Sequence, residues 1–198
     1  GAYVRSIRST PSAFDRFQAG DTTALSAQAR QGLALFRGRA GCAACHLLEG
    51  ANAPVTDFAF HNTGIAWQSA PAGTLLAPDS MDAVLDGGRQ GVSSRPTERR
   101  AFKTPTLRDV AQRGPHMHDR SLATPGDVVR YYAGGGSKDP QQDARLQGFE
   151  ATSQEVAALV AFLQSLSGDV RPGQAERVWG QRAEQTVLCI VDALGRPL

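Results

Sequence analysis

Two cysteines and a histidine stand together in one motif, Cys42-Ala43-Ala44-Cys45-His46. Two thiols at this spacing can reach the two vinyl groups on one edge of a porphyrin, and an imidazole directly after them can turn back onto the iron. The motif therefore predicts one covalently bound haem c, attached through Cys42 and Cys45, with His46 as the proximal iron ligand. The motif occurs once in the chain.

Two other chemistries use the same residue types. A thioredoxin-like redox pair requires a βαβ context, whereas a helical pattern precedes Cys42. Zinc could bind to Cys42, Cys45, His46 and Cys189, but the second cysteine pair that is typical of such sites is missing. Haem is favoured, and both alternatives stay open at this stage.

The ligand on the other face of the iron decides whether a haem carries electrons or meets substrates. A thioether there raises the potential, and an oxyanion favours the oxidised states. From the residues alone, Met117 ranks above Tyr132. The other residues with a suitable donor atom, each with an ordinary packing or solvated role as its alternative, are Met81, His61, His116, His118 and Tyr131.

Three helices are expected to position these residues. Apolar residues recur at helical spacing over residues 26–37, so a helix there should deliver the chain to Cys42. The segment 124–127, Thr-Pro-Gly-Asp, is typical of a helix start, and that helix should carry Tyr132. A third helix over residues 152–166 opens with a capping box.

Glycines and prolines gather between residues 50 and 118, which predicts long loops that could wrap a cofactor. The expected fold class is all-α, a cytochrome c-like haem domain with long loops. We expect residues 1–22 to end a preceding domain or form a linker, and residues 23–168 to form the mono-haem domain. Residues 169–198 read as a linker and the start of an appended segment, with a short β-strand near its end.

Charge and hydropathy exclude two classes of partner. The chain has 21 lysines and arginines against 19 aspartates and glutamates, a formal charge of +2, without the basic stripe of a nucleic-acid-binding protein. No apolar run approaches the roughly 20 residues of a membrane span. The first residues also lack the apolar stretch of a signal peptide.

Several segments between residues 3 and 168 resemble, in the same order, a known family. The chain is similar to the C-terminal haem domain of bacterial di-haem cytochrome c peroxidases and of the MauG-like enzymes. The matching segments are Phe14-Asp15-Arg16-Phe17 with Gly20-Asp21, Gly32 to Phe36, Phe60 to Gly64, Phe102 to Ala111, Pro115 to Asp119, Val128 to Tyr132, and Glu155 to Leu166.

The resemblance implies the distal ligand. Peroxidases of the family place Met on the helix after the His-Asp segment, whereas MauG-like proteins place Tyr there. The position falls on Tyr132, which reverses the ranking against Met117. The family also holds calcium between its two haem domains, partly through backbone carbonyls that correspond to Arg113 and Pro115, and carbonyl oxygens suit calcium.

The resemblance further implies the electron-transfer haem domain of a peroxidase-type oxidoreductase, periplasmic or otherwise exported, with a second haem domain or a redox protein as partner. The chain departs from the family at Arg120, where Gly is usual, and it lacks the peroxide-binding haem domain. Trp67 is either an electron relay or, more simply, a packing residue. Arg108 either neutralises a haem propionate or lies on the surface.

Two other functions stay open. One is a stand-alone periplasmic electron-carrier cytochrome without catalytic activity, and an intact precursor without a second Cys-x-x-Cys-His would favour it. The other is a single-haem enzyme in which Tyr132 does not bind the iron and the distal site is open to cyanide or peroxide.

Overall fold

The computed structural model describes residues 8–9, 11–50, 53–68, 85–137 and 139–171. Its contacts divide the chain into two units. One unit is Ser12–Ser167 and contains all the helices described below. The other joins residues from both ends, where β1 (Arg8–Ser9) pairs antiparallel with β4 (Val170–Arg171).

Three longer helices form the helical part of the Ser12–Ser167 unit. They are α3 (Ala27–Arg37), α7 (Pro125–Ala133) and α8 (Ser153–Ser165). Each begins where the sequence places an N-cap, because the side chains of Ser26, Thr124 and Thr152 each accept a hydrogen bond from the first turn. The three predicted helices are confirmed.

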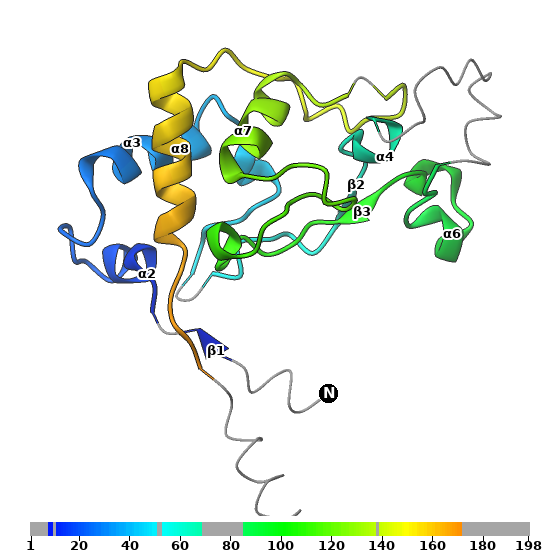
Figure 1. Cartoon of the computed structure of the whole chain (residues 1–198). Helices are drawn as coiled ribbons and strands as arrows, with labels where there is room; N and C mark the ends of the chain where they lie inside the picture. Colours follow the sequence, from blue (N-terminus) through cyan, green and yellow to red (C-terminus); the bar gives the residue numbers. More distant parts are fainter. Residues whose placement is uncertain (1–7, 10, 51–52, 69–84, 138, 172–198) are drawn as a thin grey trace, which may run out of the picture. The chain divides into compact units, whose positions relative to one another are not determined.

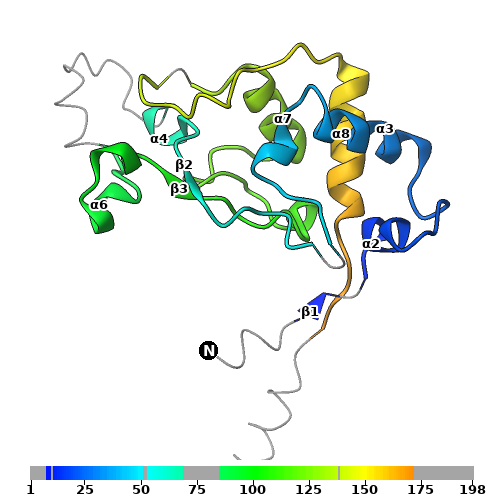
Figure 2. The same ribbon diagram turned by 180° about the vertical axis from the view of Figure 1, so that it is seen from behind.

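Helices α3 and α8 cross one another, and α7 lies beside α8 (Figures 1 and 2). Gly32 permits this close approach, because a Cβ atom there would lie 1.9 Å from the carbonyl oxygen of Ala158. At the crossing, the ring of Phe162 packs edge-to-face against Phe36 at 4.9 Å and Phe14 at 5.5 Å. These fully buried rings are the centre of the apolar core.

Phe14 comes from α2 (Ala13–Gln18), a short helix that the sequence analysis did not predict. Its N-cap is Ser12, and Asp15 completes a capping box. This helix belongs to the same compact unit as α3 and α8. The domain boundaries at residues 22 and 168 stay predictions.

The rest of the unit is mostly loop, as the glycines and prolines predict. Two short strands, β2 (Phe60–His61) and β3 (Phe102–Lys103), pair antiparallel. Single turns of helix interrupt the loops: η1 (Cys42–Ala44), α4 (Ile65–Gln68), α6 (Gln90–Ser93), η2 (Pro96–Glu98) and η3 (Val110–Gln112). In Figure 1 these loops extend from the helices toward α4 and α6.

The regular structure is mostly helical, with few short strands and long loops, as expected for a cytochrome c-like haem domain. None of the described helices is long and apolar enough to cross a membrane. The predicted C-terminal β-strand, Cys189 and Met81 lie outside the described residues.

Candidate haem site

The Cys42–His46 motif forms one tight turn directly after α3. The turn begins at Gly41, whose φ of 66° is left-handed, a conformation that glycine adopts without steric cost. Residues 42–44 then form η1, and the amide of His46 donates to the carbonyl of Cys42 at 3.0 Å. Both thiols and the imidazole therefore come from a single turn, which is what covalent haem attachment requires of this motif.

The state of the thiols argues against a redox pair. Burial raises the pKa of Cys42 to about 11 and also raises the pKa of Cys45, where Arg145 acts in the opposite direction. Both cysteines are free and are not joined by a disulfide. A thioredoxin-like nucleophile needs a lowered thiol pKa, and the burial of both thiols acts in the opposite direction.

His46 is held as an iron ligand would be. Its Nδ1 lies 3.0 Å from the carbonyl oxygen of Val55. Because a carbonyl only accepts, Nδ1 carries the proton and Nε2 keeps its lone pair for a metal. Burial lowers the pKa of His46, although the bond to Val55 opposes this shift, and a lowered pKa favours the neutral ring that binds iron.

Tyr132 lies on α7 within electrostatic reach of the same turn. Burial raises the pKa of Tyr132 well above its usual value, and its neighbour Tyr131 and the thiols of Cys42 and Cys45 raise it further. The two tyrosine rings meet edge-to-face at 5.4 Å. The hydroxyl of Tyr131 donates to the carbonyl of Thr63 at 2.8 Å, and a hydrogen bond with the Thr63 side chain acts to lower the pKa of Tyr132. Helix α7 thus carries a phenol whose ionised form is disfavoured by burial and by the thiols of the motif.

The other described candidates for the sixth ligand have different surroundings. His61 is buried between Asp57 and Asp143, with a nitrogen 2.8 Å from each carboxylate. His118 is exposed, stacked on Phe102 at 3.8 Å and paired with Asp86. His116 is buried, and its backbone pairs with that of Leu122. Met117 is half-buried with a φ of 72°.

Sequence reasoning missed the cluster around His61. Cys45, Asp57 and His61 offer ligand atoms that all lie within 4.8 Å of one another. In the described residues, no other group of three or more His, Cys, Asp or Glu side chains comes this close together. Burial raises the pKa of Asp57, but hydrogen bonds from His61 and from the amide of Ala59 outweigh it and bring the pKa to about 2. The zinc set proposed with Cys189 is not tested, because Cys189 lies outside the described residues.

Arg108 does not lie free on the surface. Its guanidinium forms two hydrogen bonds with the Asp15 carboxylate, at 2.6 and 2.7 Å, and both side chains are mostly buried. This buried bidentate pair contradicts the surface position that the sequence left open for Arg108, and the propionate role stays a prediction. No sequence signal could have identified it, since 93 residues separate the partners.

Trp67 is half-buried beneath Arg100, whose guanidinium lies 5.2 Å from the ring centroid. Arg100 is itself buried and binds both oxygens of Asp139. These contacts agree with a packing role for Trp67. The relay role stays a prediction.

The suggested calcium site finds no support. Arg113 and Pro115 are exposed, and the guanidinium of Arg113 donates to the carbonyls of Thr106 and Arg108. The metal-binding group found in the described residues lies elsewhere, at Cys45, Asp57 and His61.

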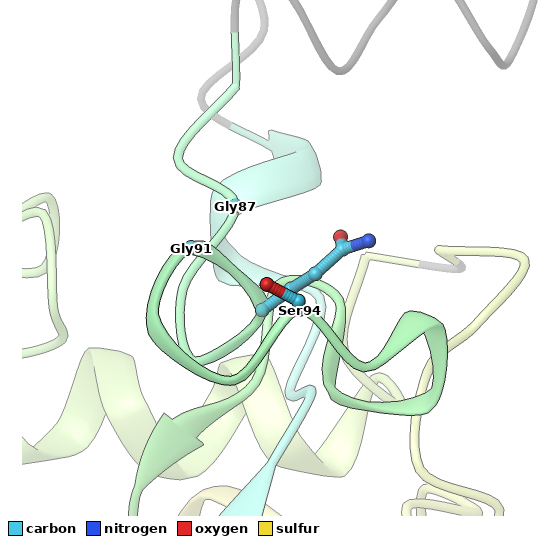
Figure 3. A pocket seen from close by; sticks show the side chains of 4 residues that line it. Gly87, Gly91 and Ser94 are labelled. Carbon is cyan, nitrogen blue, oxygen red and sulfur yellow. The ribbon is translucent and has the colours of Figure 1, made fainter.

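A pocket lies at α6. Both ribbon views draw α6 and α3 at opposite ends of the Ser12–Ser167 unit (Figures 1 and 2). It is lined by Gly87, Gln90, Gly91 and Ser94 (Figure 3). Among the residues that the structure describes, this lining includes no charged side chain, no thiol and no imidazole, so they offer no chemistry that competes with the motif.

Comparisons with known proteins agree with this geometry. Residues 29–167 match the family model described as Cytochrome c. The chain is 36% identical over 167 residues to the methylamine utilization protein MauG of Methylorubrum extorquens, covering 84% of this chain and 42% of that protein. It is 37% identical over 185 residues to the cytochrome-c peroxidase IdrP1 of Denitromonas iodatirespirans, covering 84% and 48%.

Solved structures show the same fold. A MauG-like protein associated with microbial copper homeostasis aligns with a TM-score of 0.61 and 28% identity, covering 80% of this chain and 52% of that one. The di-haem peroxidase BthA of Burkholderia thailandensis aligns at 0.56 and 23% identity, covering 79% and 46%, a likeness of fold alone. The chain thus spans about half the length of these relatives.

The matched residues include Cys42, Cys45 and His46, and a cytochrome c domain implies covalently bound haem c. The relatives are a MauG protein and a cytochrome-c peroxidase, and a MauG-like protein has the same fold. These matches indicate which branch of the cytochrome c family is concerned. This chain belongs to the cytochrome c family and, within it, to the haem domains of bacterial MauG-like proteins and di-haem cytochrome c peroxidases.

Proposed function

We propose that this chain is the electron-transfer haem domain of a MauG-like or di-haem peroxidase-type oxidoreductase. In this proposal Cys42 and Cys45 hold the haem through thioether bonds, His46 is the proximal ligand and Tyr132 is the distal ligand. The observation that carries the proposal is the single turn after α3 that presents Cys42, Cys45 and His46 together. The place of Tyr132 on α7 and the resemblance to MauG-like proteins support it as the distal ligand. A stand-alone electron carrier is not favoured, because the relatives named above are MauG proteins and peroxidases.

Haem bound here supplies reversible one-electron chemistry. The residues of this chain decide which oxidation states are stable. His46 presents Nε2 while Val55 keeps the proton on Nδ1. Tyr132 would hold the iron as a phenolate, and an anionic oxygen would favour ferric iron. If His46 and Tyr132 both held the iron, the domain would exchange electrons without binding substrate.

The partner in this proposal is a second haem domain. The relatives are about twice as long as this chain, which leaves room in them for another domain of similar size. That domain reacts with peroxide, and this one exchanges one oxidising equivalent with it. Covalent haem attachment is completed outside the cytoplasm, so we propose a periplasmic or otherwise exported protein.

Electron paramagnetic resonance and absorption spectra of the ferric protein test the ligands, and an intact-mass measurement gives the haem count. We expect one haem and a phenolate signature. A histidine–methionine spectrum would exclude Tyr132 as the ligand. A colourless protein without added mass would reject haem binding altogether and return zinc to consideration.

A further inference from the structure

The carbonyl that holds His46 belongs to a residue in an unfavourable conformation. Val55 has a φ of 52°, in the left-handed region that β-branched residues rarely adopt, and its side chain is fully buried. Strain of this kind persists only where the surrounding structure fixes it, and it is often found at functional sites. The surroundings of Val55 should therefore contain groups that hold its backbone in place.

Those groups come from residues 106–108, which donate to three consecutive carbonyls. Arg108 Nε donates to the carbonyl of Ala53 at 2.9 Å. The hydroxyl of Thr106 donates to the carbonyl of Pro54 at 2.6 Å. The amide of Leu107 donates to the carbonyl of Val55 at 3.3 Å, the same oxygen that accepts from His46. The segment that faces His46 is thus bound at every residue from 53 to 55.

Arg108 is itself anchored on its other edge. Its two terminal nitrogens bind the Asp15 carboxylate, and one of them lies 3.3 Å from the hydroxyl of Ser12. Asp15 and Ser12 form the capping box at the start of α2. The planar guanidinium of Arg108, fixed to the start of α2, can hold the Ala53 carbonyl in one place. A lysine, with its flexible side chain, could not do this equally well.

We propose that Arg108 and Thr106 are positioning residues that fix the Val55 carbonyl against His46 Nδ1 and thereby set the donor strength of the iron-bound imidazole. A carbonyl held at Nδ1 fixes the ring orientation and raises the basicity of the ligand nitrogen, which favours ferric iron. The inference rests on the proposed role of His46 as proximal ligand. The residues that would control the His46 ligand are far from it in the sequence. Asp15 precedes the haem motif, and residues 106–108 follow it by about 60 positions.

The test compares reduction potentials of the haem-loaded chain and two variants. Arg108→Lys keeps the charge but loses the fork, and Thr106→Val keeps the shape but loses the hydroxyl. Both should raise the potential, because a less firmly held carbonyl makes His46 a weaker donor. We expect a shift of about threefold in the ferric-to-ferrous equilibrium, or about 28 mV at 59 mV per tenfold change.

Arg39→Lys is the matched control. Arg39 binds Glu155 in the capping box of α8 and the carbonyl of Glu150, and it has no hydrogen bond to residues 53–55 in the described structure. It should lower thermal stability without changing the potential. If Arg39→Lys shifts the potential as far as Arg108→Lys does, the effect is general loosening and the proposal is wrong. If Arg108→Lys fails to fold, Thr106→Val decides, and an unchanged potential in that variant overturns the proposal.

The spectrum of the unmodified protein separates this inference from the proposed function. Loss of the axial histidine signature in His46→Gly shows that His46 is the ligand, whatever Arg108 does. If that signature is present and the potentials of Arg108→Lys and Thr106→Val are unchanged, only the positioning role fails. If no histidine signature is found in the unmodified protein, the proposed function fails first.

Discussion

At the scale of single residues, the site combines groups whose protonation the protein has set in advance. Burial lowers the pKa of His46, which favours its neutral ring, and raises the pKa of Tyr132, which favours its phenol form. Tyr131 and Tyr132 are neighbours on α7. Substituting each in turn compares a packing residue, Tyr131, with a proposed iron ligand, Tyr132. Tyr131 already uses its hydroxyl on Thr63, so its removal has a separate and modest expected cost.

Tyr132→Phe should open the iron to external ligands, because phenylalanine has no donor atom. We expect a high-spin ferric signal and binding of cyanide. Tyr131→Phe should keep the spectrum of the unmodified protein and lose about 1 kcal/mol of stability with the bond to Thr63. Absorption spectra with and without cyanide, together with urea unfolding, measure both effects. Equal spectra for Tyr132→Phe and the unmodified protein would rule out the tyrosine ligand.

Asp57 makes a pH-dependent contribution to stability. Its pKa is about 2 in the folded chain against an ordinary value of 3.8, so the folded state favours the carboxylate. The stabilisation is present above pH 3.8 and is lost as the pH falls through about 2. Allowing for solvent screening, we expect it to be about 1 kcal/mol. Urea unfolding from pH 6 to pH 2 should show the difference between Asp57→Asn and the unmodified chain shrinking over this range; a constant difference would contradict the assignment.

At the scale of elements, residues adjacent in the sequence determine where helices begin. Ion pairs between residues far apart in the sequence then join two of these helix starts to other parts of the unit. Capping boxes open α2, α7 and α8. In two of the three boxes the acidic residue also binds an arginine far away in the sequence: Asp15 binds Arg108, and Glu155 binds Arg39. A helix start thus serves as an attachment point for a loop.

The crossing of α3 and α8 depends on Gly32. Gly32→Ala would place a methyl group against the backbone of Ala158, and we expect a loss of about 3 kcal/mol as the helices move apart. Gly91→Ala in α6 is the control, since its Cβ would meet nothing within 4 Å. That change should be neutral or stabilise the fold by about 0.5 kcal/mol. Thermal and urea unfolding compare the two variants, and equal stabilities would mean that α3 and α8 do not pack closely.

At the scale of the Ser12–Ser167 unit, two regions differ in what holds them together. The helices share a continuous apolar core around Phe14, Phe36 and Phe162. The described loop residues 85–123 contribute only Leu85 and Ala101 to the buried apolar side chains. They rely on polar contacts such as the buried pair of Arg100 and Asp139. We therefore expect this region to depend more than the helices on a bound haem for its order.

A haem-free variant should therefore lose order unevenly. In Cys42→Ala/Cys45→Ala we expect hydrogen exchange to stay slow in α3 and α8, whose packing is independent of haem. Exchange should become faster in residues 53–61 and 101–110, where His46 and the Val55 carbonyl meet. Ala44→Ser is the control, because this exposed position changes while both thiols remain. Uniform loss of protection across the unit would show that the helical core also needs the haem.

The sequence by itself determined the features that depend on neighbours in the chain. The spacing of Cys42, Cys45 and His46 specified a turn for haem, and the caps at Ser26, Thr124 and Thr152 specified where helices begin. Those signals are local, because an N-cap bonds within its own first turn. The high content of glycine and proline between residues 50 and 118 likewise predicted the long loops.

Only the tertiary structure decided which distant side chains meet. Arg108 binds Asp15 across 93 residues, and His61 reaches Asp143 across 82. Nothing in the local sequence of an arginine or a histidine encodes its partner, since an ion pair forms wherever the packed elements bring charges together. The left-handed Val55, fully buried beside His46, is of the same kind: its conformation is imposed by residues 106–108, and packing of the whole unit holds it there.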